Sequence, residues 1–106
     1  MINVNERGVD AGGVRELGYE MKQVTGIDDC VQAVVASQGI TPTLLCEAMW
    51  MIEGGDLFDF AFVCSHATHR SVACCFLLAA VIYPHCQIIL TTARTQREAG
   101  KQGLYD

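Results

Sequence analysis

The side chains best suited to chemistry stand together in residues 64–71, which read C-S-H-A-T-H-R-S. Arg70 offers a planar guanidinium that can hold two oxygens of a phosphate group. The other polar side chains offer hydroxyl, thiol or imidazole groups: Cys64, Ser65, His66, Thr68, His69 and Ser71. Imidazoles donate more strongly below about pH 6.5, where they are protonated. The segment therefore predicts a loop that binds a phosphate-like anion.

The flanking sequence predicts how this loop is held. Phe58–Val63 is an apolar run expected to form a buried strand, and Ser71–Tyr83 is apolar almost all round, as in a buried helix that ends at Pro84. A loop at the C-terminal end of a parallel strand lies where open α/β sheets bind ligands. The helix that follows directs its unpaired N–H groups and its positive dipole end into the loop. The alternative is an ordinary helix start, with Thr68 or Ser71 as the N-cap.

Apolar periodicity predicts the remaining elements. Strands are expected at Ile2–Val4 and Gln87–Thr91, and helices from Asp28 or Asp29 to Gly39 and from Thr41-Pro42 to Gly54-Gly55. The glycine-rich residues 8–26 are expected to form a loop, and Trp50 to pack in the core or at its edge. Apolar strands joined by helices predict an α/β fold: a small three-layer sandwich with a mostly parallel sheet of three to four strands and helices on both faces. A chain of 106 residues makes one domain, 1–106, with 92–106 as a mobile or partly helical tail.

The charge and apolar content narrow the range of partners. The net charge is −5, so the basic surface typical of nucleic-acid binding is missing and we expect no nucleic-acid partner. Basic residues cluster only near the C-terminus, where acidic residues dilute them, and we expect a solvated tail there: Arg94, Arg97, Glu98, Lys101 and Asp106. Hydrophobic residues make up 51% of the chain, enough to fill a core and leave apolar surface for a second copy. A homo-oligomer is expected.

The cysteines and the apolar runs predict a cytoplasmic protein. The chain has six cysteines, but it opens without an apolar leader and contains no C-x-x-C pair. We therefore expect reduced thiols, no metal ion and no cofactor. The longest apolar run, Val72–Tyr83, is too short for a membrane span, which needs about twenty residues.

The spacing of Cys64, Arg70 and Ser71 resembles C-x5-R-S, the loop of cysteine-dependent phosphatases. The resemblance implies that the Cys64 thiolate attacks phosphorus, that Arg70 holds the phosphoryl oxygens and that Ser71 eases release of the cysteine. A general acid would come from Asp28 or Asp29, although either residue can instead cap a helix. Val63 replaces the histidine that usually precedes the cysteine of this family.

A second resemblance covers more of the chain. Residues 63–72, V-C-S-H-A-T-H-R-S-V, are similar to G-C-T-G-G-x-H-R-S-V of the C-terminal domain of the RapZ family. Residues 20–28, E-M-K-Q-V-T-G-I-D, look like that family's E-L-R-x-x-T-G-L-D. The family includes RNase adaptors that sense glucosamine-6-phosphate, and His69 favours it over the phosphatases. Its paired loop glycines are His66 and Ala67 here, and its nucleotide-binding domain is absent from this sequence.

This resemblance implies a domain that binds a phosphosugar or similar anion through its phosphate group. Its expected ligand contacts are the whole loop with three residues outside it: Cys64, Ser65, His66, Ala67, Thr68, His69, Arg70 and Ser71, with Asn5, Arg7 and Thr25. We therefore expect a sensory or regulatory phosphometabolite-binding domain that performs no catalysis. Inorganic phosphate or sulfate should bind the same loop. Two alternatives stay open: a phosphatase that uses Cys64, Arg70 and Asp28, and an assembly module without a ligand.

Overall fold

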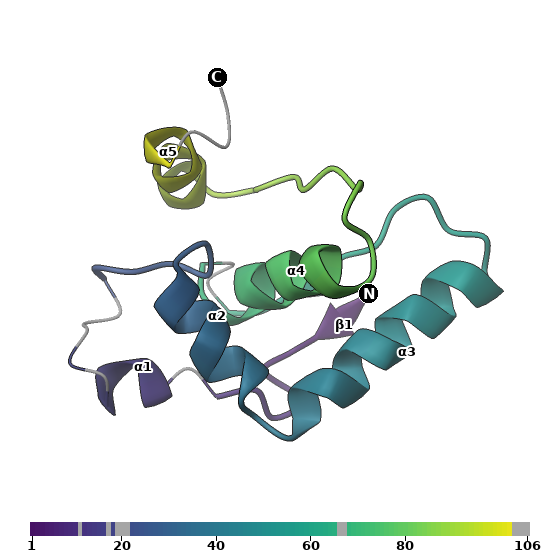
Figure 1. Ribbon diagram of the computed structural model, residues 1–106, viewed down its shortest axis with the longest axis horizontal. Coiled ribbons are helices and arrows are strands. Elements are labelled where there is room, and N and C mark those ends of the chain that lie inside the picture. The colour runs from purple at the N-terminus through teal and green to yellow at the C-terminus, as the bar shows by residue number, and fades with distance from the viewer. Residues whose placement is uncertain (11, 17, 19–21, 66–67, 103–106) are drawn as a thin grey trace.

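A computed structural model describes residues 1–10, 12–16, 18, 22–65 and 68–102, and within them the chain forms five helices and a two-stranded sheet (Figure 1). The strands are β1 (Ile2–Asn3) and β2 (Phe62–Val63). The helices are α1 (Gly13–Glu16), α2 (Asp29–Ala36), α3 (Ile40–Gly54), α4 (Arg70–Val81) and α5 (Ala93–Lys101). The result is a compact, mostly helical α/β domain. None of the described helices has the length and apolar character to cross a membrane.

The two strands are parallel, with Ile2 opposite Phe62 and Asn3 opposite Val63. The Ile2 N–H donates to the Ala61 carbonyl at 3.0 Å, and the Val4 N–H to the Val63 carbonyl at 2.9 Å. Parallel neighbours need a long crossover, and the chain from α1 to α3 supplies it. Both strands therefore end at the same edge of the sheet, where the candidate loop begins.

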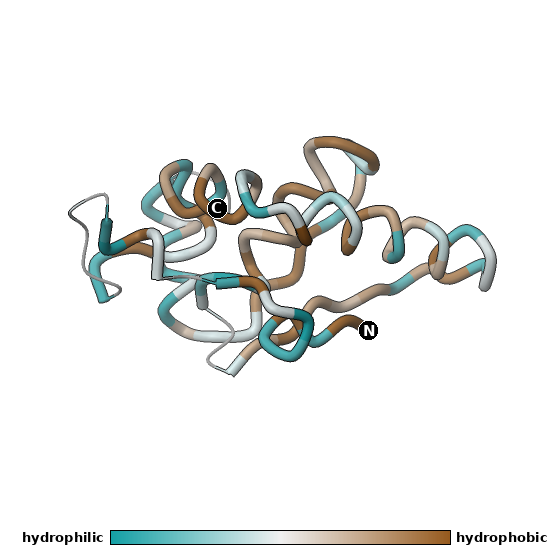
Figure 2. The backbone as a smooth tube through the Cα atoms, turned by 90° about the horizontal axis from the view of Figure 1, so that it is seen from below, coloured by the Kyte–Doolittle hydropathy of each residue, from teal (hydrophilic) through white to brown (hydrophobic). Residues whose placement is uncertain are grey.

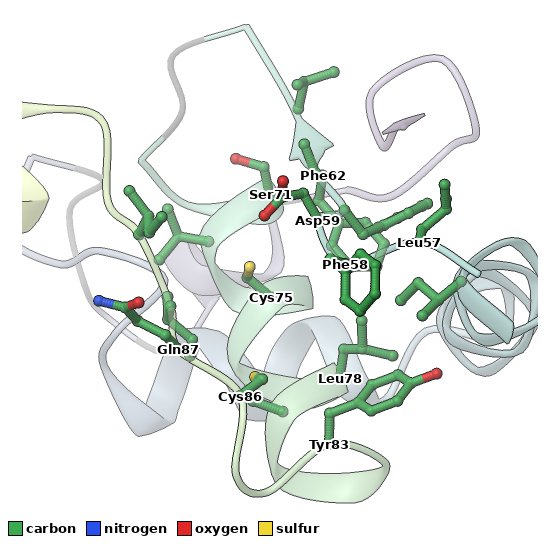
Figure 3. A pocket seen from close by; sticks show the side chains of 18 of the residues that line it. Leu57, Phe58, Asp59, Phe62, Ser71, Cys75, Leu78, Tyr83, Cys86 and Gln87 are labelled. Carbon is green, nitrogen blue, oxygen red and sulfur yellow. The ribbon is translucent and has the colours of Figure 1, made fainter. Parts of the chain in front are cut away.

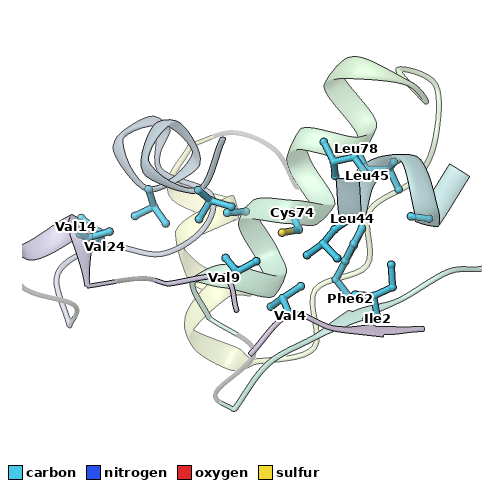
Figure 4. Packing of buried hydrophobic residues seen from close by; sticks show 14 residues of the cluster. Ile2, Val4, Val9, Val14, Val24, Leu44, Leu45, Phe62, Cys74 and Leu78 are labelled. Atoms are coloured by element: carbon cyan, nitrogen blue, oxygen red, sulfur yellow. The ribbon is translucent and has the colours of Figure 1, made fainter. Parts of the chain in front are cut away.

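Helix α4 is central to the packing and contacts α2, α3 and β2. Its Cys74 is fully buried in the main core, together with Ile2 of β1, valines of α2 and leucines of α3 (Figure 4). Burial raises the pKa of Cys74 to about 12, with smaller contributions from Cys75 and Cys64. A second buried cluster joins Val72 of α4 to Ile27, Leu90 and Ala99, and so packs α5 near the start of α4.

Several predicted elements are confirmed with shifted boundaries. Helix α2 has Asp28 as its N-cap residue, and the expected C-terminal helical tail is α5, which begins after Thr92. Residues 103–106 lie outside the described part. Helix α3 begins one residue before the predicted cap: Gly39 is the N-cap residue, and the Thr41 hydroxyl donates to the Val35 carbonyl at 2.6 Å. The predicted loop 8–26 contains the short helix α1.

The prediction of three to four strands is wrong for the described residues. Only residues 62 and 63 of the run Phe58–Val63 belong to a strand, and Gln87–Thr91 has no regular secondary structure. Leu90 and Ile88 pack in the cluster around Val72 of α4, so part of this segment is buried without pairing to β2, while Ile89 stays exposed. The prediction for Trp50 is also wrong, since its side chain is 74% exposed. It lies outside the stripe of α3 whose buried members include Leu44 and Ala48.

Candidate functional site

The loop after β2 leads directly into the first turn of α4. Cys64 and Ser65 follow the strand, and α4 begins at Arg70, while His66 and Ala67 lie outside the described residues. His69 is the N-cap residue, but its side chain makes no capping hydrogen bond. The first bond of the helix runs from the Ala73 N–H to the His69 carbonyl at 2.9 Å. The N–H groups before Ala73 have no partner within the helix and can bind an anion.

Cys64 and Ser71 contact one another across the mouth of the loop. The Cys64 thiol donates to Ser71 Oγ at 3.0 Å, with Ser71 buried and Cys64 half-buried. If Cys64 lost its proton, the Ser71 hydroxyl could turn and donate to the thiolate. A hydrogen bond to the charged form stabilises a thiolate, so the arrangement suits a nucleophilic cysteine as well as an anion contact.

The side chains of His69 and Arg70 both bond to backbone carbonyls beside the loop. Arg70 Nη1 donates to the Val9 carbonyl at 3.3 Å, which is a long hydrogen bond. A guanidinium carries several N–H donors, so this contact leaves others for an anion. His69 Nε2 lies 2.7 Å from the Val24 carbonyl, and because a carbonyl can only accept, Nε2 carries the proton.

Sequence analysis missed Arg94. Its Nη2 donates to the same Val24 carbonyl at 2.8 Å from a position 70 residues away in the chain. The expectation of a solvated tail is therefore wrong for this residue, which is half-buried. The available signal was the cluster of basic residues near the C-terminus, but nothing in their spacing indicated which of them turns toward the loop.

Residues 24–28 pack against the loop through their backbone. The Gly26 N–H donates to the Thr68 carbonyl at 2.7 Å. A Cβ atom on Gly26 would lie 2.3 Å from the His69 carbonyl oxygen and 2.4 Å from the Ala73 nitrogen, so only glycine fits this approach. Thr25 is buried, and its hydroxyl accepts from the Ile27 N–H at 3.2 Å. Asp28 closes the same turn by accepting from the Thr25 N–H at 2.7 Å.

The two N-terminal candidates, Asn5 and Arg7, point to different partners. Asn5 Nδ2 donates to Ser65 Oγ, which links the end of β1 to the loop, while Asn5 Oδ1 is buried without a hydrogen-bond partner in the described part of the chain. Arg7 instead forms a two-pronged ion pair with Glu47 of α3, at 2.6 and 2.8 Å. This hydrogen bonding raises the pKa of Arg7 and lowers that of Glu47.

The structure thus brings most of the predicted contacts to one place. The loop and its immediate neighbours gather around the start of α4: Asn5, Cys64, Ser65, Thr68, His69, Arg70 and Ser71. Arg7 is engaged with Glu47, and the side chains of Thr25 and Asp28 are engaged within their own turn.

A pocket of about 680 Å³ extends from this site along one side of α4 (Figure 3). Cys64 and Ser71 are among its lining residues, and Tyr83 lines it beyond the other end of α4. One wall comes from residues 56–63 and the other from residues 86–91. Sequence analysis missed this pocket because it expected strands at Phe58–Val63 and Gln87–Thr91 in one sheet.

Comparisons with known proteins give no indication of function. The chain matches no protein-family model, no curated protein and no solved structure. Among the described residues, no three His, Cys, Asp or Glu side chains are placed to hold a metal ion. The chemistry must therefore be inferred from the residues of the loop and their geometry.

Proposed function

We propose that this domain binds a phosphorylated small molecule at the loop 64–71 and acts as a cytoplasmic sensor or regulator without catalysing a reaction. The observation that carries the proposal is the start of α4. The helix follows a parallel strand after the loop, its N-cap residue makes no side-chain capping hydrogen bond, and Arg70 and Ser71 lie in its first turn. Helix N–H groups, a guanidinium and a hydroxyl are together suited to a phosphate.

The contact between the two sequence motifs supports a domain of the RapZ C-terminal type. The motifs that carry this resemblance lie far apart in the chain, yet the Gly26 N–H donates to the Thr68 carbonyl, and His69 bonds to Val24 from 45 residues away. The close approach of Gly26 to the backbone of α4 gives a physical reason for the Thr-Gly pair in residues 20–28. The six free cysteines fit a reducing compartment.

The unpartnered oxygen of Asn5 supports a ligand that also carries a donor. A buried acceptor without a hydrogen bond costs about 1–3 kcal/mol, and a ligand hydroxyl or amine beside the phosphate would recover part of this. Phosphosugars carry such groups next to their phosphate. The Asn5–Ser65 contact places this oxygen next to the loop.

Thermal unfolding tests the proposal. Wild type, Arg70→Ala and the exposed-arginine control Arg97→Ala would be melted with phosphate, sulfate, glucose-6-phosphate and glucosamine-6-phosphate. A ligand at about 100 times its Kd stabilises the folded state by roughly 2.7 kcal/mol, which raises Tm by several degrees in a domain of this size. We expect this shift in wild type and Arg97→Ala and its loss in Arg70→Ala. No shift with any anion would refute the proposal.

A cysteine-dependent phosphatase is the second candidate, favoured by the contact of Cys64 with Ser71. An enzyme of this class needs a reactive Cys64 thiolate and loses all turnover in Cys64→Ser, whereas a binder keeps its ligand in the same variant. Iodoacetamide labelling near neutral pH, with exposed Cys46 as the reference thiol, measures this reactivity. Fast, phosphate-protected labelling of Cys64 with turnover of a phosphate ester would replace the binder with the enzyme.

We also propose that the domain assembles into a homo-oligomer. Several large apolar side chains are exposed in the chain as described, among them Trp50 and Phe58. Scattered exposed apolar residues are normal, so sedimentation velocity must decide. Wild type should sediment as an oligomer, and Trp50→Ser should shift it toward the monomer. If the chain assembles but responds to no anion, assembly alone becomes the better account.

A further inference from the structure

The pocket beside α4 begins where the proposed anion loop ends. Cys64 and Ser71 belong to both, so a ligand held at the loop has direct access to the pocket. Its volume of about 680 Å³ is within the range of small-molecule sites. The pocket runs along α4 from the first turn toward Tyr83, as Figure 3 shows.

The lining of the pocket is largely apolar. Its walls and floor include two aromatic rings, a thiol and three aliphatic side chains: Phe60, Phe62, Cys75, Leu78, Ile88 and Leu90. Phe60 and Phe62 pack edge to face, with ring centroids 5.5 Å apart. Phe58 on one wall and Ile89 on the other are exposed by 101% and 73%. An apolar group between the walls would cover this surface, which is favourable.

The charged residues of the lining indicate which end of a ligand lies at the loop and which lies in the pocket. The charged residues of the lining are all acidic, namely Glu53, Asp56 and Asp59. They repel an anion from the pocket itself, so a phosphate is favoured only outside it, at the positive end of α4.

We propose that the ligand is a phosphate monoester with an apolar body, its phosphate beside Cys64, Arg70 and Ser71 and its body in the pocket beside α4. This inference rests on the proposed phosphate binding at the loop. It adds that affinity grows with the apolar surface of the body, because each buried methylene group leaves water.

Titration calorimetry with alkylphosphonates tests this assignment. Methyl-, butyl- and hexylphosphonate carry the same anionic head, and their C–P bond resists phosphatase chemistry. We expect affinity to rise about two- to fourfold for each added methylene that enters the pocket. Phe58→Ser and Ile89→Ser should reduce that increment and leave methylphosphonate binding unchanged. Val81→Ser removes an exposed apolar side chain outside the pocket lining and is the matched control.

The outcomes separate this inference from the proposed function. Equal affinity for methyl- and hexylphosphonate overturns the apolar body and leaves phosphate binding intact. Absence of binding by inorganic phosphate and by every phosphonate overturns phosphate binding itself. If hexan-1-ol binds as tightly as hexylphosphonate, and Arg70→Ala has no effect, the pocket binds apolar groups without a phosphate at the loop. This outcome also overturns the inference.

Discussion

Replacement of Gly26 by alanine should push residues 24–28 away from the start of α4. The new Cβ atom would lie 2.3 Å from the His69 carbonyl oxygen, 2.4 Å from the Ala73 nitrogen and 2.7 Å from Val72 Cβ. Two of these neighbours are backbone atoms of the start of α4, which cannot rotate away as a side chain can. Gly26 is not among the glycines with positive φ, so the cost arises from contact and not from backbone conformation.

The size of the effect follows from these distances. Van der Waals contact needs more than about 3 Å, so the two segments must move apart by roughly 1 Å. Overpacking of this kind costs about 1–3 kcal/mol. The movement also weakens the Gly26–Thr68 and His69–Val24 hydrogen bonds, each worth about 0.5–1.5 kcal/mol. Gly26→Ala should therefore lower the free energy of unfolding by about 2–6 kcal/mol, a large part of the stability of a small domain.

Urea unfolding followed by circular dichroism measures this change. Gly54→Ala is the matched control, because a Cβ atom on Gly54 meets nothing within 4 Å and alanine is the better helix former. The control should unfold at the same or a higher urea concentration. The phosphate-induced rise in Tm should also be smaller in Gly26→Ala than in wild type. If Gly26→Ala and wild type share a midpoint and an m-value, the close approach does not exist and this reasoning fails.

Three other predictions follow from single contacts. Burial raises the pKa of Cys74 to about 12, so above pH 9 this thiol ionises in the unfolded chain before it ionises in the folded one. At pH 10.5 the free energy of unfolding of wild type should therefore fall by about 2 kcal/mol, as measured by urea unfolding. Cys74→Ala should not show this loss. Thr92 caps α5 by accepting from the Thr95 N–H, so Thr92→Ala should cost about 1 kcal/mol in the same assay. The hydrogen bond from Tyr83 to Glu53 raises the pKa of Tyr83 to about 12, and Glu53→Gln should lower it in an ultraviolet titration.

The parts of the fold that the sequence predicts well are those with local causes. Apolar spacing predicts the helices over residues 29–36 and 70–81 to within about three residues. The polar break after Val63 correctly marks where the strand ends and the loop begins. Each of these signals depends only on neighbours in the chain.

The parts that sequence analysis misses depend on distant packing. The apolar run Gln87–Thr91 indicates burial, but only Leu90 is buried, against α4, and Ile88 is partly buried beside it. The contact of Arg94 with Val24 spans 70 residues, and no spacing rule connects them. The spacing of the motif around Gly26 likewise does not indicate that Gly26 lies against the backbone of α4.

The Val24 carbonyl is a shared acceptor beside the proposed anion site. It accepts hydrogen bonds from His69 Nε2 and from Arg94 Nη2. These two bonds use both lone pairs of the carbonyl oxygen. The bond of His69 Nε2 to Val24 helps to fix the start of α4. Arg70 brings a permanent positive charge to the first turn of α4, and its 3.3 Å hydrogen bond to the Val9 carbonyl is long enough to yield to a phosphate.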